Sequence, residues 1–188
     1  MINFNKPYLT GKEMHYMYQA VYSGKISGNG LFTKKCQAFL EEKYGFKKTL
    51  LTTSCTDALE MCAILANIQP GDEVIVPSFT FVASVEVIAL LGLKPIVVDV
   101  DPRTFLLKIE DIEASLSPRT KAIIPVHLFG QCVNMKALMA IAKNRDLYVI
   151  EDNAQSIGAR CISTGDAKEM SGTIGHIGCT SFYPSKNL

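Results

Sequence analysis

The sequence predicts an α/β fold in which helices cover both faces of a mostly parallel sheet. From residue 73 to residue 150, short runs rich in Val and Ile alternate with segments of helical periodicity, a pattern typical of parallel strands joined by crossover helices. The runs lack polar–apolar alternation, which indicates strands buried on both faces. A chain of 188 residues with 48% hydrophobic residues can bury one core of this kind.

The opening third of the chain is expected to supply helices and one strand. Apolar spacing predicts helices over residues 13–22 and 32–44, the second of which ends at Gly45. Residues 49–52 read as a strand, and an amphipathic helix is expected over residues 58–67.

Strands and helices alternate after this point. Pro184 ends the last strand, because proline has no N–H to donate to a ladder. The expected elements are a strand at 73–76, a helix at 80–91, a strand at 95–98, a helix at 109–116, a strand at 122–126, a helix at 135–144, and strands at 147–150 and 179–183.

Composition excludes several function classes. A formal net charge of +1 gives no basic field, so a nucleic-acid partner is not expected. The longest apolar stretch, residues 82–93, is too short to span a bilayer and contains Ser84 and Glu86. The first residues lack the basic-then-apolar pattern of a signal peptide.

The six cysteines form no C-x-x-C pair, and most lie within apolar runs. Each is therefore expected to be a buried, reduced thiol, which predicts a cytoplasmic protein. The three histidines show no zinc spacing, so no metal site is expected. The cysteines are Cys36, Cys55, Cys62, Cys132, Cys161 and Cys179.

Ligands of an open parallel sheet bind outside the carboxyl ends of its strands. The segments that follow the expected strands are 78–81, 99–101, His127, 151–155 and 181–186. The chain has no G-x-G-x-x-G after its first strand, so a dinucleotide fold is not supported.

A hydroxyl-rich turn over residues 53–57 precedes the helix expected at 58–67. Ser54 and Asp57 resemble a capping box. Backbone N–H groups at such a helix start can bind phosphate. An ordinary N-cap that binds no ligand is an equally good interpretation.

Pyridoxal phosphate requires the combination found at this edge: a lysine, an acid for the ring nitrogen, a phosphate cup and a flat surface for the ring. Lys186 leaves the last strand, where a partly desolvated amine can attack carbonyls, although a solvated surface lysine fits as well. Asp152 suits the acid or a structural helix cap, and Phe81 suits ring stacking or the core. His127 is expected to be a satisfied core histidine without a chemical role.

The segments 53–59, 71–82, 125–127, 149–156 and 180–187 carry a family resemblance. In their order and spacing, the chain resembles the DegT/DnrJ/EryC1/StrS sugar aminotransferases, fold-type I enzymes that use pyridoxal phosphate. Its opening half is most similar to transaminases that make dTDP-4-amino-4,6-dideoxygalactose. The resemblance implies a three-layer α/β/α large domain.

The resemblance assigns the reaction to two residues. Lys186 would form the Schiff base with the cofactor and carry protons between substrate and cofactor. Asp152 would pair with the pyridine nitrogen. Related dehydratases carry histidine in place of Lys186, so the chain resembles an aminotransferase.

Further residues are implied to hold the cofactor. Gln155 stands where the family packs a side chain over the ring, and Phe81 stands where it stacks an aromatic. Thr56, the backbone of Asp57, and Ser181 match phosphate ligands.

The implied reaction is a ping-pong transfer from glutamate to the keto group of a nucleotide-linked sugar, most closely a 4-keto-6-deoxy sugar, in a homodimer. Residues 1–188 would form a large domain that stops before its last strand, with the small domain absent. The missing last strand would leave residues 49–52 without a sheet neighbour. The short chain favours an alternative, a non-catalytic fragment that binds the cofactor or a partner. Residues 161–171 are expected to be a polar loop without an assigned role.

Overall fold

The computed structural model describes residues 8–163 and 168–186 and divides into two compact units. The first unit is Met1–Leu51 with Tyr183–Ser185, and the second is Thr52–Phe182 with Lys186–Leu188. No helix within the described residues is long and apolar enough to cross a membrane.

The first unit contains α1 (Glu13–Tyr22) and α2 (Leu31–Tyr44), which confirm the two predicted helices. α2 ends at Gly45, which adopts a left-handed conformation with a φ of 77°, as glycine does without steric cost. The rings of Tyr16 and Phe32 meet edge to face with centroids 5.5 Å apart, so the start of α2 packs against α1.

The strand predicted over residues 49–52 is wrong. The Thr49 N–H donates to the Glu41 carboxylate at 2.9 Å, and no described strand pairs with this segment. An extended segment becomes a strand only when a neighbouring strand pairs with its backbone groups. The family resemblance led us to expect that this segment lacks a sheet neighbour, and none of the described strands pairs with it.

The second unit is built on a parallel sheet whose described strands lie in the order β2-β1-β3-β4-β7. Every neighbouring pair is parallel, which confirms the predicted sheet type. The strands are β1 (Glu73–Pro77), β2 (Lys94–Val98), β3 (Thr120–Ile123), β4 (Tyr148–Asp152) and β7 (Ile177–Cys179).

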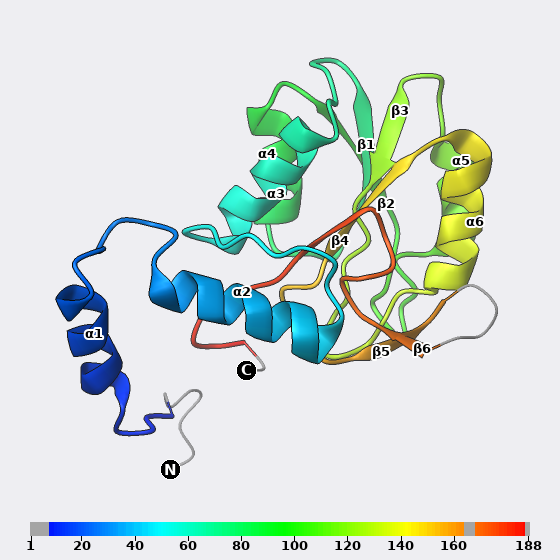
Figure 1. Cartoon of the computed structure of the whole chain (residues 1–188). Helices are drawn as coiled ribbons and strands as arrows, with labels where there is room; N and C mark the ends of the chain where they lie inside the picture. The colour runs from blue at the N-terminus through cyan, green and yellow to red at the C-terminus, as the bar shows by residue number, and fades with distance from the viewer. Residues whose placement is uncertain (1–7, 164–167, 187–188) are drawn as a thin grey trace, which may run out of the picture. The chain divides into compact units, whose positions relative to one another are not determined.

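Two helix layers cover the faces of this sheet, as Figure 1 shows. α3 (Cys55–Leu65) and α4 (Ala83–Leu90) lie on one face, and α5 (Ile109–Ser115) and α6 (Met135–Arg145) lie on the other. Successive side chains of a strand point to opposite faces, so each strand of the sheet buries residues under both helix layers.

Along β1, Val74 and Val76 join the core cluster beneath α3 and α4, whereas Ile75 joins the cluster beneath α5 and α6. Both faces are therefore apolar, which explains the uninterrupted Val and Ile runs. In the first cluster, the thiols of Cys62 on α3 and Cys179 on β7 lie 3.3 Å apart.

Several predicted boundaries are wrong by a few residues. The helix expected at 58–67 begins at Cys55, and the helix expected at 80–91 is confined to α4. The strand expected at 179–183 ends at Cys179, because its partner β4 ends at Asp152. The chain then turns away as the Asn153 N–H bonds to the Cys179 carbonyl at 2.8 Å.

The segment 161–171, predicted to be a loop, carries regular structure at both ends. β5 (Arg160–Ile162) pairs antiparallel with β6 (Lys168–Met170). Residues 164–167 lie outside the described residues. Each strand has three residues, too few for a periodic sequence signal.

The expected buried, reduced state of the cysteines is wrong at four positions. Cys132 and Cys161 form a disulfide with Cα atoms 5.4 Å apart. Cys36 carries a free thiol but is exposed, and the free thiol of Cys55 is only half-buried. The bonded pair is 29 residues apart in sequence, and only the fold brings it together. Reduced, buried thiols are found as expected at Cys62 and Cys179.

Candidate functional site

The carboxyl ends of the parallel strands meet the start of α3 at one edge of the second unit. β4 ends at Asp152 and is followed by a turn over residues 154–158. Beside it, β7 leads through Ser181 toward Lys186. This edge is where the predicted site residues were expected.

Asp152 is a buried carboxylate, 5% exposed. Its Oδ2 accepts a hydrogen bond from the Ser84 hydroxyl at 2.7 Å, and its Oδ1 accepts from the Ala154 N–H at 3.0 Å. The fully buried Ser84 also lies 2.9 Å from the Thr80 hydroxyl. These bonds fix the carboxylate and leave lone pairs for another donor. No described helix follows Asp152 directly, so the predicted helix-cap alternative is wrong.

The turn before α3 is the capping arrangement that the sequence predicted. Ser54 is the N-cap, and its hydroxyl accepts from the Asp57 N–H at 3.0 Å. The Thr53 hydroxyl donates to the Asp57 carboxylate and, with Ser54, holds the pKa of that group below its ordinary value. The N–H groups of Cys55 and Thr56 lie in the first turn, which has no intrahelical acceptors for them. The cap therefore coexists with an electropositive helix start.

Cys55 links the two groups proposed for chemistry. Burial, followed by the Asp152 charge, raises the pKa of its thiol to about 12 against the opposing effect of the Lys186 charge. Cys55 therefore lies within electrostatic reach of both Asp152 and the half-buried Lys186. Sequence analysis did not assign this thiol to the site. Its position between Ser54 and Thr56, in the turn predicted to bind phosphate, was the available signal.

The residues expected around the cofactor occupy different environments. Phe81 precedes α4 and is 66% exposed, so the core alternative for this ring is wrong. Gln155 is half-buried in the turn after β4, where its carbonyl accepts from the Gly130 N–H at 3.2 Å. Ser181 is buried beyond the end of β7.

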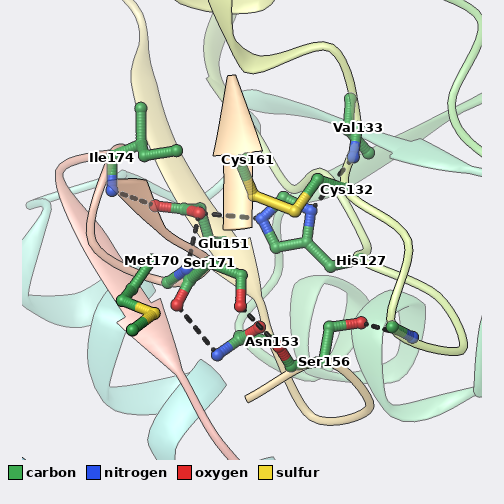
Figure 2. Close-up of a disulfide and its surroundings, with 12 residues drawn as sticks. His127, Cys132, Val133, Glu151, Asn153, Ser156, Cys161, Met170, Ser171 and Ile174 are labelled. Carbon is green, nitrogen blue, oxygen red and sulfur yellow. Dashed lines mark hydrogen bonds and ion pairs between the residues drawn. A yellow bond between two sulfur atoms is a disulfide. The ribbon is translucent and has the colours of Figure 1, made fainter. Parts of the chain in front are cut away.

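Glu151 is a second buried carboxylate at this edge, and sequence analysis assigned it no role. Its Oε1 accepts from the N–H groups of Ile174 (2.7 Å) and Gly175 (2.5 Å). Its Oε2 accepts from the Gly172 N–H (2.8 Å) and from His127 Nε2 (2.7 Å). Figure 2 shows this carboxylate among its partners. Glu151 thus fixes the loop that leads into β7.

His127 is the satisfied core histidine that the sequence predicted. It is fully buried, and its Nδ1 accepts from the Val133 N–H at 3.2 Å. The proton must therefore lie on Nε2, which donates to Glu151. One ligand atom each from His127, Cys132 and Cys161 lie within 4.8 Å of one another, a spacing that suits a metal ion. Here, however, the sulfur atoms are bonded to each other and both ring nitrogens are engaged.

Comparison with known proteins matches this chain to one family. A sequence model of the DegT/DnrJ/EryC1/StrS aminotransferase family matches residues 7–188. A UDP-N-acetyl-3-dehydro-α-D-glucosamine 3-aminotransferase of Acidithiobacillus ferrooxidans is 51% identical over 72% of the chain. A UDP-2-acetamido-2-deoxy-3-oxo-D-glucuronate aminotransferase of Pseudomonas aeruginosa is 46% identical over 79% of the chain. The matches cover 35% and 40% of these two relatives.

Solved structures share the fold. A putative sugar aminotransferase of Streptococcus pneumoniae, solved in a PMP form, matches with a TM-score of 0.90 and 31% identity. The match covers 100% of this chain and 50% of that chain. The PLP form of the same protein matches with a TM-score of 0.88 and 30% identity over 100% of this chain and 50% of that chain. The chain thus spans about half the length of these proteins, or less.

Proposed function

Because the chain belongs to the DegT/DnrJ/EryC1/StrS aminotransferase family, we propose that it is the cofactor-binding part of a pyridoxal-phosphate-dependent sugar aminotransferase. The observation that carries the proposal is the fixed, buried carboxylate of Asp152, which shares an electrostatic neighbourhood with Lys186. Residues 1–188 would correspond to the large, cofactor-binding domain.

The donor set at this edge fits the cofactor. A protonated pyridine nitrogen needs a buried anion with a spare lone pair, which Asp152 has. A phosphate needs N–H donors at a positive helix end, which the first turn of α3 presents at Cys55 and Thr56. When bound, pyridoxal phosphate supplies an aldehyde carbon and a ring that accepts electrons.

Each residue then has a defined task. Lys186 would offer its Nζ amine to the aldehyde and hold or release protons at that atom. Asp152 would keep a proton on the ring nitrogen. The Thr56 and Ser181 hydroxyls would hold the phosphate, as would the Asp57 N–H, which would share its bond to Ser54.

Two side chains are proposed to cover the ring. Phe81 is exposed before α4 and would stack on one ring face. Gln155 would pack over the ring and exclude water. Both tasks orient the ring without taking part in bond making.

The amino acceptor is proposed to be a nucleotide-linked keto-sugar, with glutamate as the amino donor. The family resemblance favours a 4-keto-6-deoxy sugar. A second candidate is a UDP-linked 3-keto sugar, because two relatives of 51% and 46% identity are named for 3-dehydro and 3-oxo UDP-sugars. A homodimer in the cytoplasm is proposed for the working form.

A cofactor trap tests the proposal. The chain is mixed with pyridoxal phosphate, its visible absorbance is recorded, borohydride fixes the label, and mass spectrometry finds the modified peptide. We expect one label, on Lys186, that Lys186→Ala removes. The matched control is Lys121→Ala, since Lys121 is an exposed lysine of β3. Labels scattered over surface lysines would contradict the proposed site.

Turnover separates the enzyme from the non-catalytic alternative. The loaded chain is incubated with glutamate and with 4-keto-6-deoxy or 3-keto nucleotide sugars, and amino-sugar products are measured. Product from either sugar supports the aminotransferase. A folded, singly labelled chain that turns over none of these sugars would support the cofactor-binding fragment.

A further inference from the structure

The disulfide of Cys132 and Cys161 opens onto a pocket that has no part in the proposed function. Residues around the start of α5, the segment before α6 and β5 line this pocket. Cys161 is 1% exposed, whereas Cys132 is half-buried. Figure 2 shows the bond beside His127. Both cysteines therefore line the pocket, and Cys132 is the more exposed of the two residues.

We propose that Cys132 and Cys161 form a reversible dithiol–disulfide site that exchanges with a small-molecule thiol entering this pocket. A thiol attacks along a path to sulfur, and Cys132 is the more accessible of the two cysteines in the pocket. Among the cations that line the pocket, Lys108 is paired with Asp111 at 2.9 Å. Arg160 is exposed and offers a guanidinium to a thiol bearing carboxylates, such as a glutathione-type peptide.

The exchange balances without another reactant. A thiolate attacks Cys132 Sγ, the bond between the cysteines breaks, and Cys161 leaves as a thiolate that takes a proton from solvent. A second thiol attacks the mixed disulfide on Cys132, releases the small-molecule disulfide and frees the Cys132 thiol. Two small thiols are oxidised and one protein disulfide is reduced. Oxidised small-molecule disulfide reverses the sequence.

The neighbouring histidine favours this chemistry over metal binding. A metal ligand needs a free imidazole lone pair. The Nδ1 lone pair of His127 accepts the Val133 N–H, and Nε2 carries the proton donated to Glu151. Metal binding would break one of these buried hydrogen bonds, whereas thiol exchange breaks neither.

The Cys132–Cys161 disulfide joins the segment after Gly130 to β5, and both lie next to the turn that carries Gln155. The Gly130 N–H lies 3.2 Å from the Gln155 carbonyl and 3.1 Å from the Ser156 hydroxyl. Cys132 follows Gly130 by two residues, and Cys161 lies in β5, just beyond the turn. Opening the bond removes the covalent tie beside Gln155. Its effect on the cofactor ring rests on the proposed function, but the exchange itself does not.

The test uses the full chain in glutathione buffers of varied redox ratio. Samples are quenched with acid and alkylated, and each cysteine is followed by peptide mass spectrometry. We expect Cys132 and Cys161 to change together at a single midpoint. Cys36, the exposed free cysteine of α2, is the control and should form only a mixed disulfide with glutathione. Independent titration of Cys132 and Cys161, or no disulfide in oxidised glutathione, would overturn the proposal.

Single substitutions test which sulfur is attacked. Cys161→Ser should accumulate a mixed disulfide on Cys132. Cys132→Ser should label Cys161 at least about tenfold more slowly, because Cys161 is the more buried residue. Equal labelling in the two variants would overturn the assignment of Cys132 as the entry point.

Amide hydrogen exchange tests, without any cofactor, whether the disulfide stabilises the hydrogen bond between Gly130 and Gln155. Reduction should speed exchange at Gly130 about tenfold and leave β1 and β3 unchanged. The Cys132→Ser/Cys161→Ser double variant should show the fast rate in both redox states. A rise spread over β1 and β3 as well would contradict a local tie.

Discussion

The carboxylates of Glu151 and Asp152, consecutive residues of β4, lie on opposite faces of the sheet. Glu151 binds His127 and the loop before β7, whereas Asp152 binds Ser84 on α4. The alternation of a strand imposes this separation. One strand end therefore supplies a structural carboxylate to one layer and a candidate cofactor ligand to the other.

Asp152→Asn should weaken pyridoxal phosphate binding with little loss of stability. An amide oxygen can still accept from Ser84 or Ala154, but the charge-assisted bond to the ring nitrogen is lost, at a cost of about 2 kcal/mol or roughly 30-fold in affinity. Titration of the chain with cofactor, followed by visible absorbance, measures the change. Glu113→Gln, on an exposed carboxylate of α5, is the control. Unchanged affinity in Asp152→Asn would argue against the assigned role.

Glu151→Gln should destabilise the protein by about 3 kcal/mol, because an amide nitrogen would face N–H donors in a buried site. The donors are the N–H groups of Gly172, Ile174 and Gly175. Urea unfolding at neutral pH measures the loss, again with Glu113→Gln as the control. A loss no larger than that of the control would mean that the network contributes nothing to folding.

Gly178→Ala should prevent stable folding of the second unit. A Cβ at Gly178 would overlap the backbone of Gly172, and backbone atoms cannot yield without moving β7. A cost of at least about 3 kcal/mol is expected. Circular dichroism and thermal melting give the comparison with Gly28→Ala, where a Cβ meets open space. Equal melting temperatures in the two variants would refute the close approach.

Acid should remove a stabilising contribution at the amino end of the sheet. The Ser117 hydroxyl, followed by Lys94 and Arg119, holds the pKa of the Glu73 carboxyl below its ordinary value of 4.5. A depressed carboxyl pKa stabilises the fold above the unfolded value, and this contribution is lost as pH falls through the folded value. Urea unfolding from pH 7 to pH 3 should therefore show Glu73→Gln less stable at pH 7, with the difference closing below pH 4.5. A constant difference would contradict the linkage.

Cys55 should resist alkylation in the folded protein. Its thiol pKa of about 12, against an ordinary value of 9.0, leaves about a thousandfold less thiolate near pH 8 than in the unfolded chain. Iodoacetamide labelling with and without urea, followed by peptide mass spectrometry, measures the ratio. Lys186→Ala should slow labelling further, because the lysine charge lowers this pKa. An unchanged labelling rate in that variant would place Lys186 away from the thiol.

The sequence predicted the parallel sheet because Val and Ile runs such as residues 73–76 are buried on both faces. It also predicted the cap before α3, since Ser54 and Asp57 are three residues apart and act locally. Patterns of this kind depend on neighbours in sequence. The sheet type and the helix cap can therefore be predicted without knowledge of tertiary contacts.

Several features that the sequence did not predict depend on distant partners. Residues 49–52 needed a neighbouring strand, and Cys132 needed Cys161. The loop donors to Glu151 lie 21 to 24 residues further along the chain. Neither periodicity nor local spacing in a sequence indicates which distant residues come into contact. Sequence analysis therefore could not predict the partners of these residues.

The contact between Cys62 and Cys179 joins residues 117 positions apart. During synthesis, α3 leaves the ribosome long before β7, and its apolar face meets β7 only after β1 to β6 are made. Closing so long a loop costs entropy before the contact returns any stabilisation. The edge that carries Asp152 and Lys186 is therefore assembled late in folding, and a chain stalled before β7 docks would leave the inner face of α3 open to aggregation.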